Sequence, residues 1–243
     1  MFRYPLERVT PYIKSTTLRL FGGVAAAGFL VGSVVFVQPA RAQQPVTLQF
    51  ETHAAFFSQE TGRTKAIDPQ VFVEEADAPA ATGPQNIKHI AGFRTALILD
   101  TPDRKLFSAA GRTLGFTLGK WLGASGKVIL VPVPSGAEKV IAVFTGLKPG
   151  GVYSLFENHF DQKPIGFTPL DGQGTGNSFV AGNDGRGAVS LVVPHQLTND
   201  NAVLLVYHSD GESHGTSRGE IGVTAHHHLI APFKLATGTG ALR

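Results

Sequence analysis

The nine residues 207–215, with the sequence YHSDGESHG, hold a dense group of side chains that could do chemistry. The last five residues fit the G-x-S-x-G pattern of a hydrolase nucleophile elbow, with Ser213 as the nucleophile. The two histidines are candidate metal ligands, and Asp-Gly is a strong signal for a hairpin turn. The segment therefore supports three alternatives, which are a serine hydrolase, a metal site and a hairpin turn.

A nucleophile elbow lies between a strand and a helix of a parallel α/β sheet. The run AVLLVYH before Ser213 predicts a strand, but TSRGEIGVTA after it contains two glycines and has no amphipathic stripe. Glu220 and one of His226, His227 and His228 would have to complete the catalytic triad. A hydrolase that uses Ser213 is therefore the third of three hypotheses.

Five of the nine histidines of the chain lie between His208 and His228. Side chains alternate along a strand, so a two-residue Asp-Gly turn places His208 and His214 on opposite faces. A three-residue turn instead pairs them on one face, close enough to chelate a metal. In the next strand, His226 and His228 share a face. A site formed by His208, His214 and either His226 or His228 would suit Cu or Zn.

The elements that would hold these side chains are short apolar runs between Gly, Pro, Asn and Asp, which predict strands. The runs are VTLQF from Val46, QVFVEE from Gln70, TALILD from Thr95, KVILVPV from Lys127, KVIAVF from Lys139, VYSLF from Val152, SFVAG from Ser178, AVSLVV from Ala188, AVLLVYH from Ala202 and EIGVTAHHHLIAPF from Glu220. This pattern predicts an all-β fold, an antiparallel β-sandwich, with a β-barrel as the alternative.

Turn residues predict two hairpins, one with its turn at residues 134–136 and one with its turn at residues 183–185. A single short helix is predicted over LGKWL, with Thr117 as its cap and Gly123 at its end. Trp121, the only tryptophan, would plug one end of the sandwich.

Two long irregular stretches separate the predicted strands. Residues 74–92 are acidic and then rich in Pro and Ala, which predicts an exposed loop. Residues 157–177 form a connection of a length that is often functional, and they carry His159, Phe160 and Phe167. These three residues and Tyr207, the first residue of YHSDGESHG, are the predicted ligand-binding residues.

The N-terminal residues 1–42 have the features of a secretory signal peptide. A basic segment precedes the apolar run LFGGVAAAGFLVGSVVFV, and Ala40-Arg41-Ala42 provides a cleavage site before Gln43. The alternative is a retained membrane anchor. Cleavage would leave a single all-β domain over residues 43–233 and a flexible tail over residues 234–243, in the periplasm or outside the cell.

Charge and cysteine content exclude several classes of function. After removal of residues 1–42, 16 basic residues face 17 acidic ones, so nothing indicates nucleic-acid binding. Membrane contact would be limited to the signal peptide before cleavage. The chain has no cysteine, which excludes thiol nucleophiles, cysteine metal ligands and disulfides.

The stretch GLKPGGVY, at residues 146–153, resembles the loop-to-strand junction of fibronectin type III domains and related sandwiches. Over residues 139–230 the chain also resembles bacterial secreted proteins of unknown activity that share GL-x-P-x-GVY-x-L and YHSDG-x-x-HG. The first resemblance implies architecture, and the second implies secretion. Neither implies a catalytic role for any residue.

The first functional hypothesis is an exported, non-catalytic binding or structural module for a periplasmic or extracellular ligand. Its binding surface would combine residues 157–177 with the turn at residues 207–219. The second hypothesis is a histidine-based metal protein, either a carrier or a small redox enzyme. The hydrolase follows as the third.

Overall fold

The computed structural model describes residues 44–233, so the predicted signal peptide and the predicted tail lie outside the described residues. The described fold is mostly β, with 45% strand and 8% helix. Within residues 44–233, neither α-helix is long and apolar enough to cross a membrane. The all-β prediction is confirmed.

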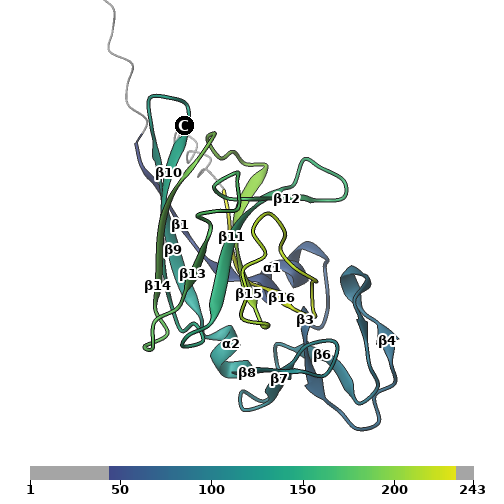
Figure 1. The fold of residues 1–243 in the computed structure, drawn as a ribbon. Coiled ribbons are helices and arrows are strands. Elements are labelled where there is room, and N and C mark those ends of the chain that lie inside the picture. The colour runs from purple at the N-terminus through teal and green to yellow at the C-terminus, as the bar shows by residue number, and fades with distance from the viewer. Residues whose placement is uncertain (1–43, 234–243) are drawn as a thin grey trace, which may run out of the picture. The chain divides into compact units, whose positions relative to one another are not determined.

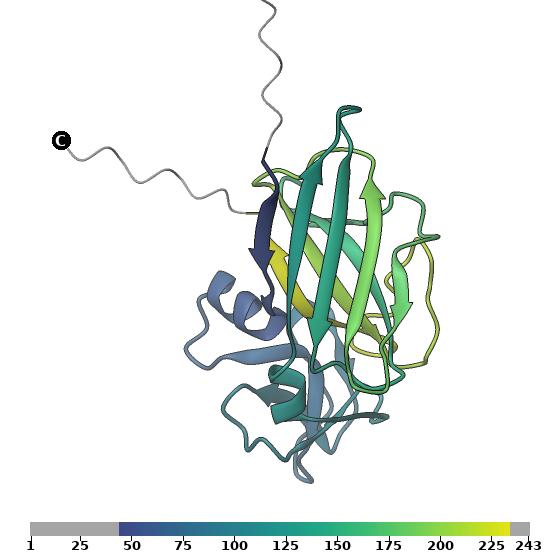
Figure 2. The ribbon, with the colours of Figure 1, turned by 90° about the vertical axis from the view of Figure 1, so that its left-hand side faces the viewer.

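Two antiparallel sheets pack face to face (Figures 1 and 2). Sheet 1 has the order β1 (Val46–Gln49), β9 (Ser125–Pro132), β10 (Glu138–Thr145), β14 (Gly187–Val193). Sheet 2 has the order β12 (Gly166–Pro169), β11 (Val152–His159), β15 (Asn201–His208), β16 (Ala225–Pro232), β2 (Glu51–Thr52), and β13 (Ser178–Val180) pairs with β11. Both sheets stay open at their edges among the described residues. The fold is therefore the predicted sandwich and not the closed alternative.

The main core lies between the two sheets. It includes Val128 and Val140 from sheet 1 and Leu155, Leu205 and Leu229 from sheet 2. A second apolar cluster lies on the other face of sheet 2, and its members are Phe156, Ala202, Leu204, Val206, Ala225 and Ile230. Sheet 2 is therefore buried on both faces, which is why β15 is buried at every position whereas β10 alternates along most of its length.

A third sheet lies beyond one end of the sandwich (Figure 2). Its order is β6 (Phe93–Leu97), β3 (Ile67–Glu74), β7 (Lys105–Phe107), β8 (Thr113–Thr117). Beside it are the pair β4 (Ala81–Thr82) and β5 (Lys88–His89), a 3-10 turn η1 (Pro84–Asn86), and the helices α1 (His53–Glu60) and α2 (Leu118–Leu122). The predicted exposed loop at residues 74–92 is thus partly ordered, and its Ile87 and His89 are buried.

The two predicted hairpins have different outcomes. The turn at residues 134–136 joins β9 to β10 as expected, with Glu138 opposite Pro132. The turn at residues 183–185 does not form a hairpin, because β13 pairs with β11 while β14 pairs with β10. It carries the chain from sheet 2 to sheet 1, which the turn residues alone do not reveal.

The predicted helix is confirmed as α2, between Thr117 and Gly123, and its Trp121 is fully buried. Residues 157–177 are more regular than predicted. β11 continues to His159, and β12 pairs back against it with Phe167 opposite Asn158.

A β-bulge interrupts the pairing of β15 with β16. Leu205 lies opposite Leu229, but Val206 lies opposite His227, so His228 is the extra residue. His226 and His228 consequently face the sandwich core, and His227 faces the outer side of sheet 2. This distribution of the three histidines decides which of them can join a site in the neighbouring loop.

Candidate functional site

Residues 209–224, here called the 209–224 loop, connect β15 to β16, because His208 is paired with Ala225. Ser209 N donates to Thr224 O at 2.7 Å and closes the base of the loop. Gly211 N donates to His208 O at 3.3 Å and forms its first turn. The predicted short hairpin is therefore wrong in both of its versions. The chain forms a long loop that folds back over the outer face of sheet 2.

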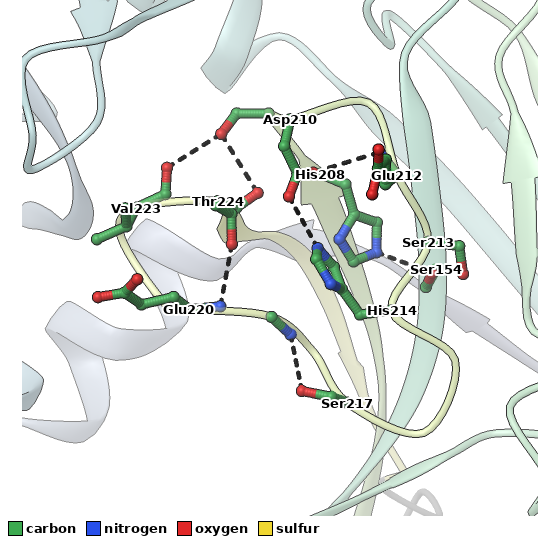
Figure 3. Close-up of polar contacts among 12 residues, drawn as sticks. Ser154, His208, Asp210, Glu212, Ser213, His214, Ser217, Glu220, Val223 and Thr224 are labelled. Carbon is green, nitrogen blue, oxygen red and sulfur yellow. Dashed lines mark hydrogen bonds and ion pairs between the residues drawn. The ribbon is translucent and has the colours of Figure 1, made fainter.

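Three side chains of this region converge (Figure 3). The ring centroids of His208 and His214 are 5.3 Å apart, and His214 Nε2 lies 2.9 Å from Asp210 Oδ2. One ligand atom from each of His208, Asp210 and His214 lies within 4.8 Å of the other two. We call these three residues the His-Asp-His cluster.

His208 is the buried member of the cluster. Its Nε2 lies 2.8 Å from Ser154 Oγ of β11, whereas its Nδ1 is buried without a hydrogen-bond partner. Figure 3 shows this second nitrogen on the side of Asp210 and His214. Burial lowers the pKa of His208 to about 4, with a smaller contribution from His214, so the ring is neutral at pH 7. A neutral imidazole is the form that binds metals.

The backbone of the loop at Gly219 packs closely against the His214 ring. Gly219 has φ +84°, and a Cβ at this position would lie 3.1 Å from His214 Nε2. A larger residue would be strained in this conformation and would press on the imidazole. The glycine therefore allows the returning chain to lie close to the cluster.

The other two predicted metal ligands lie elsewhere. His226 Nδ1 is 3.0 Å from Gln70 O, and His228 Nε2 is 2.8 Å from Trp121 O. Both rings lie on the core side of sheet 2, opposite to His208. Asp210, which the sequence indicated only as a turn residue, takes the third position. Its spacing of four residues from His214 was the signal that sequence reasoning missed.

Ser213 lies exposed in the loop, with its Oγ 3.5 Å from Gly215 N. No helix follows it, because the described chain continues as loop to Ala225. The strand-turn-helix arrangement of a nucleophile elbow is therefore not formed at this serine.

The predicted ligand-binding residues separate into distinct environments. Tyr207 is a core residue with 2% exposure, and its hydroxyl accepts from Lys148 Nζ at 2.9 Å. His159 Nε2 lies 2.9 Å from Thr168 Oγ1. Phe167 lies beneath the guanidinium of Arg218. Phe160 lines a sizeable cavity.

That cavity is a groove of about 540 Å³. Phe160 stacks on Phe56 of α1 with ring centroids 5.8 Å apart, and Ile165 and Pro232 extend the apolar lining. Lys163 lies among the polar lining residues. We call this cavity the Phe56/Phe160 groove. The sequence did not indicate Phe56 as a binding residue, because α1 was not predicted.

Fold and site together define an open β-sandwich with a His-Asp-His cluster in the loop that covers its second sheet. Comparison of the chain with models of protein families, with curated proteins and with solved structures gives no match. The resemblances noted in the sequence therefore remain predictions.

Proposed function

We propose that this is an exported binding protein that holds one divalent transition-metal ion, Zn or Cu, at His208, Asp210 and His214. The observation that supports it is the buried, unpartnered Nδ1 of His208 beside two further ligand atoms. Buried nitrogens rarely lack a partner, and a metal ion would supply one. Export is supported by the sequence of residues 1–42, and a mature N-terminus at Gln43 would support it further.

The ligand chemistry fits this proposal. Two imidazoles and one carboxylate are a common ligand set for Zn, with bonds of about 2.0–2.2 Å and an open fourth position. The contact of 2.9 Å between His214 and Asp210 needs only a small opening to admit the ion. The open position suits a carrier, which must also release its metal.

Ser154 acts on the site through His208. When His208 Nε2–H donates to Ser154 Oγ, the lone pair lies on Nδ1, toward Asp210 and His214. Such outer partners fix the tautomer and orientation of a ligand, and their loss typically weakens metal binding about 10–100-fold. Ser154 is therefore a positioning residue for the metal.

We expect close to one Zn ion per chain after loading and dialysis of protein purified without a histidine tag, measured by elemental analysis. His214→Ala should weaken Zn binding in calorimetric titration by more than about 100-fold, because a direct ligand matters more than an outer partner. The Zn affinity of Ser154→Ala should lie between that of His214→Ala and that of the wild type. His195→Gln is the control, because His195 binds Glu157 and is not part of the cluster.

Fewer than about half a Zn or Cu ion per loaded chain would contradict the proposal, since a structural site approaches one. Equal Zn affinities of the His214→Ala and His195→Gln variants would also contradict it. Both results are interpretable only if the variants melt as single cooperative transitions.

The Phe56/Phe160 groove favours a second candidate function, the binding of a small apolar molecule. Its volume of about 540 Å³ falls within the range of small-molecule sites, about 300–1,000 Å³. We expect the native protein to bind the dye 1-anilinonaphthalene-8-sulfonate, and Phe160→Ser to weaken this binding at least about fivefold by removing a stacked aromatic surface. Val180→Ser removes an exposed apolar side chain and is the control. Unchanged dye emission in Phe160→Ser would contradict the proposal that the Phe56/Phe160 groove binds apolar molecules.

A further inference from the structure

Arg218 is a largely buried cation without an acidic partner. Its Nη1 donates to His227 Nε2 at 2.9 Å, and its guanidinium lies 3.3 Å from the ring centroid of Phe167. Within residues 44–233, no carboxylate lies within ion-pair distance of it. Burial lowers the pKa of Arg218 to about 10, with no acid acting in the opposite direction. Removing a guanidinium from water without a counter-charge is costly.

Arg94, by contrast, is an arginine with carboxylate partners. Its Nη1 and Nη2 bind Asp100 at 2.8 and 2.7 Å, and its Nε binds Glu75. These carboxylates raise its pKa above the usual value. Arg218 has the opposite environment, so a purely structural role does not account for it.

The hydrogen-bond network behind Arg218 is short of acceptors. Arginine stays protonated, so His227 Nε2 must accept, and the proton of that neutral ring lies on Nδ1. His227 Nδ1 can then donate to His53 Nε2, 3.4 Å away. This fixes the proton of His53 on Nδ1, which is buried and has no partner. The network ends in an unpaired donor and offers no negative group to the cation.

We propose that Arg218 is the recognition group for an anionic ligand, the carboxylate of a small organic acid. The proposal goes beyond the metal site and does not depend on it. The guanidinium uses one Nη1 donor on His227, and its central carbon lies over the Phe167 ring. A carboxylate matches two parallel N–H donors of that fork.

The surroundings favour a monoanion with an apolar body. A single positive charge balances one carboxylate, whereas a phosphate dianion would need a second cation. Phe160 and Phe167 pack against the same apolar cluster on the outer face of sheet 2. The Phe167 ring provides apolar surface directly beside the charge, and benzoate is therefore a suitable probe.

The test uses the full chain after metal removal with EDTA, and titrates benzoate, uncharged benzamide and inorganic phosphate by calorimetry and thermal melting. Benzoate should bind the wild type and raise its melting temperature, and benzamide should not. Arg218→Gln should weaken benzoate binding at least about tenfold, the effect of losing a charge-assisted hydrogen bond. Its melting temperature without ligand should equal or exceed that of the wild type, because the unpaired buried charge is gone. Arg186→Gln is the matched control, since Arg186 is exposed and lies beside Asp184.

Equal benzoate binding by Arg218→Gln and the wild type would overturn the proposal, as would equal binding of benzoate and benzamide. Displacement of benzoate by phosphate at lower concentration would overturn the carboxylate assignment. If Arg218→Gln fails to fold, Arg218→Lys keeps the charge without the fork and must still weaken benzoate binding. His214→Ala should retain benzoate binding, which separates this result from failure of the metal proposal.

Discussion

Acidification should unfold the metal-free protein between about pH 6 and pH 4. Burial lowers the pKa of His226 and His228 to about 4 and that of His53 to about 3. It also lowers the pKa of His227 well below the usual value, and the neighbouring His53 and Arg218 lower it further. In the unfolded chain, each of these rings titrates near 6.5. The folded state therefore cannot take up the protons that the unfolded chain accepts.

The direction of the effect follows from this difference in proton uptake. Below pH 6.5 the unfolded chain holds more protons, so the free energy of unfolding falls as the pH falls. One pKa unit corresponds to about 1.4 kcal/mol, so His226 alone destabilises the fold by on the order of 3 kcal/mol below pH 4. His228, whose pKa is also about 4, contributes a similar amount, and His53 and His227 act in the same direction. These contributions oppose a stability that is typically about 5–15 kcal/mol.

Asp68 acts in the opposite direction, because burial raises its pKa to about 6. Its neutral form is favoured in the fold, so its contribution to stability grows as the pH falls from 6 toward its unfolded value near 3.9. One carboxyl offsets only part of the effect of four histidines. The net result remains acid unfolding.

Fluorescence of Trp121 and far-ultraviolet circular dichroism should record this transition together, because Trp121 is the only tryptophan and stacks on His228 at 3.7 Å. His53→Phe should move the midpoint to lower pH by removing one buried imidazole. His195→Gln should leave the midpoint in place, since that residue is partly exposed and its amide can still donate to Glu157. Native spectra at about pH 3.5 would contradict the prediction.

Trp121→Ala should lower the free energy of unfolding by about 3–5 kcal/mol, the usual result of removing a buried aromatic side chain. The indole is fully buried and packs edge-on against Phe116 at 5.2 Å. Its Nε1 also donates to Asp68 Oδ2 at 2.8 Å. Losing that donor leaves a buried carboxyl less satisfied, which costs about 1–3 kcal/mol more. Urea unfolding followed by circular dichroism measures the change.

Trp121→Phe separates the two contributions. This variant keeps most of the packing and removes the donor to Asp68. The decrease in the free energy of unfolding should therefore be smaller than for Trp121→Ala, on the order of 1–3 kcal/mol. The loss should be greater at about pH 7.5 than at about pH 5.5, because the pKa of Asp68 is about 6 and only the ionised carboxyl depends strongly on the donor. An equal loss at both pH values would show that packing alone accounts for the role of Trp121.

The sequence predicted the sandwich because most of its strands are bounded by clear turn residues. It predicted α2 from Thr117 and Gly123, which flank a short apolar run. It did not predict α1, whose eight residues HAAFFSQE show no strong amphipathic pattern and are ordered by packing against β3 and β16. Tertiary contacts decide the structure of such a segment, and one sequence does not display them.

The candidate site was predicted in part. Sequence reasoning identified His208 and His214, but it treated the three following histidines as one regular strand. The bulge at His228 and the long loop after His208 depend on pairing between strands, which strand alternation cannot supply. Asp210 was visible in the sequence but was assigned to a turn. Arg218 had no assigned function, because its isolation from carboxylates appears only in three dimensions.

The burial of sheet 2 on both faces has a practical consequence for attaching the protein to a surface. The 209–224 loop covers one face of that sheet, and sheet 1 covers the other. Lys139 of β10 is exposed on the outer side of sheet 1, so the thickness of the sandwich separates it from the loop. The chain contains no cysteine, and Lys139→Cys would therefore introduce a unique thiol. Immobilisation through that thiol would present the His-Asp-His cluster and Arg218 away from the support, in a single orientation.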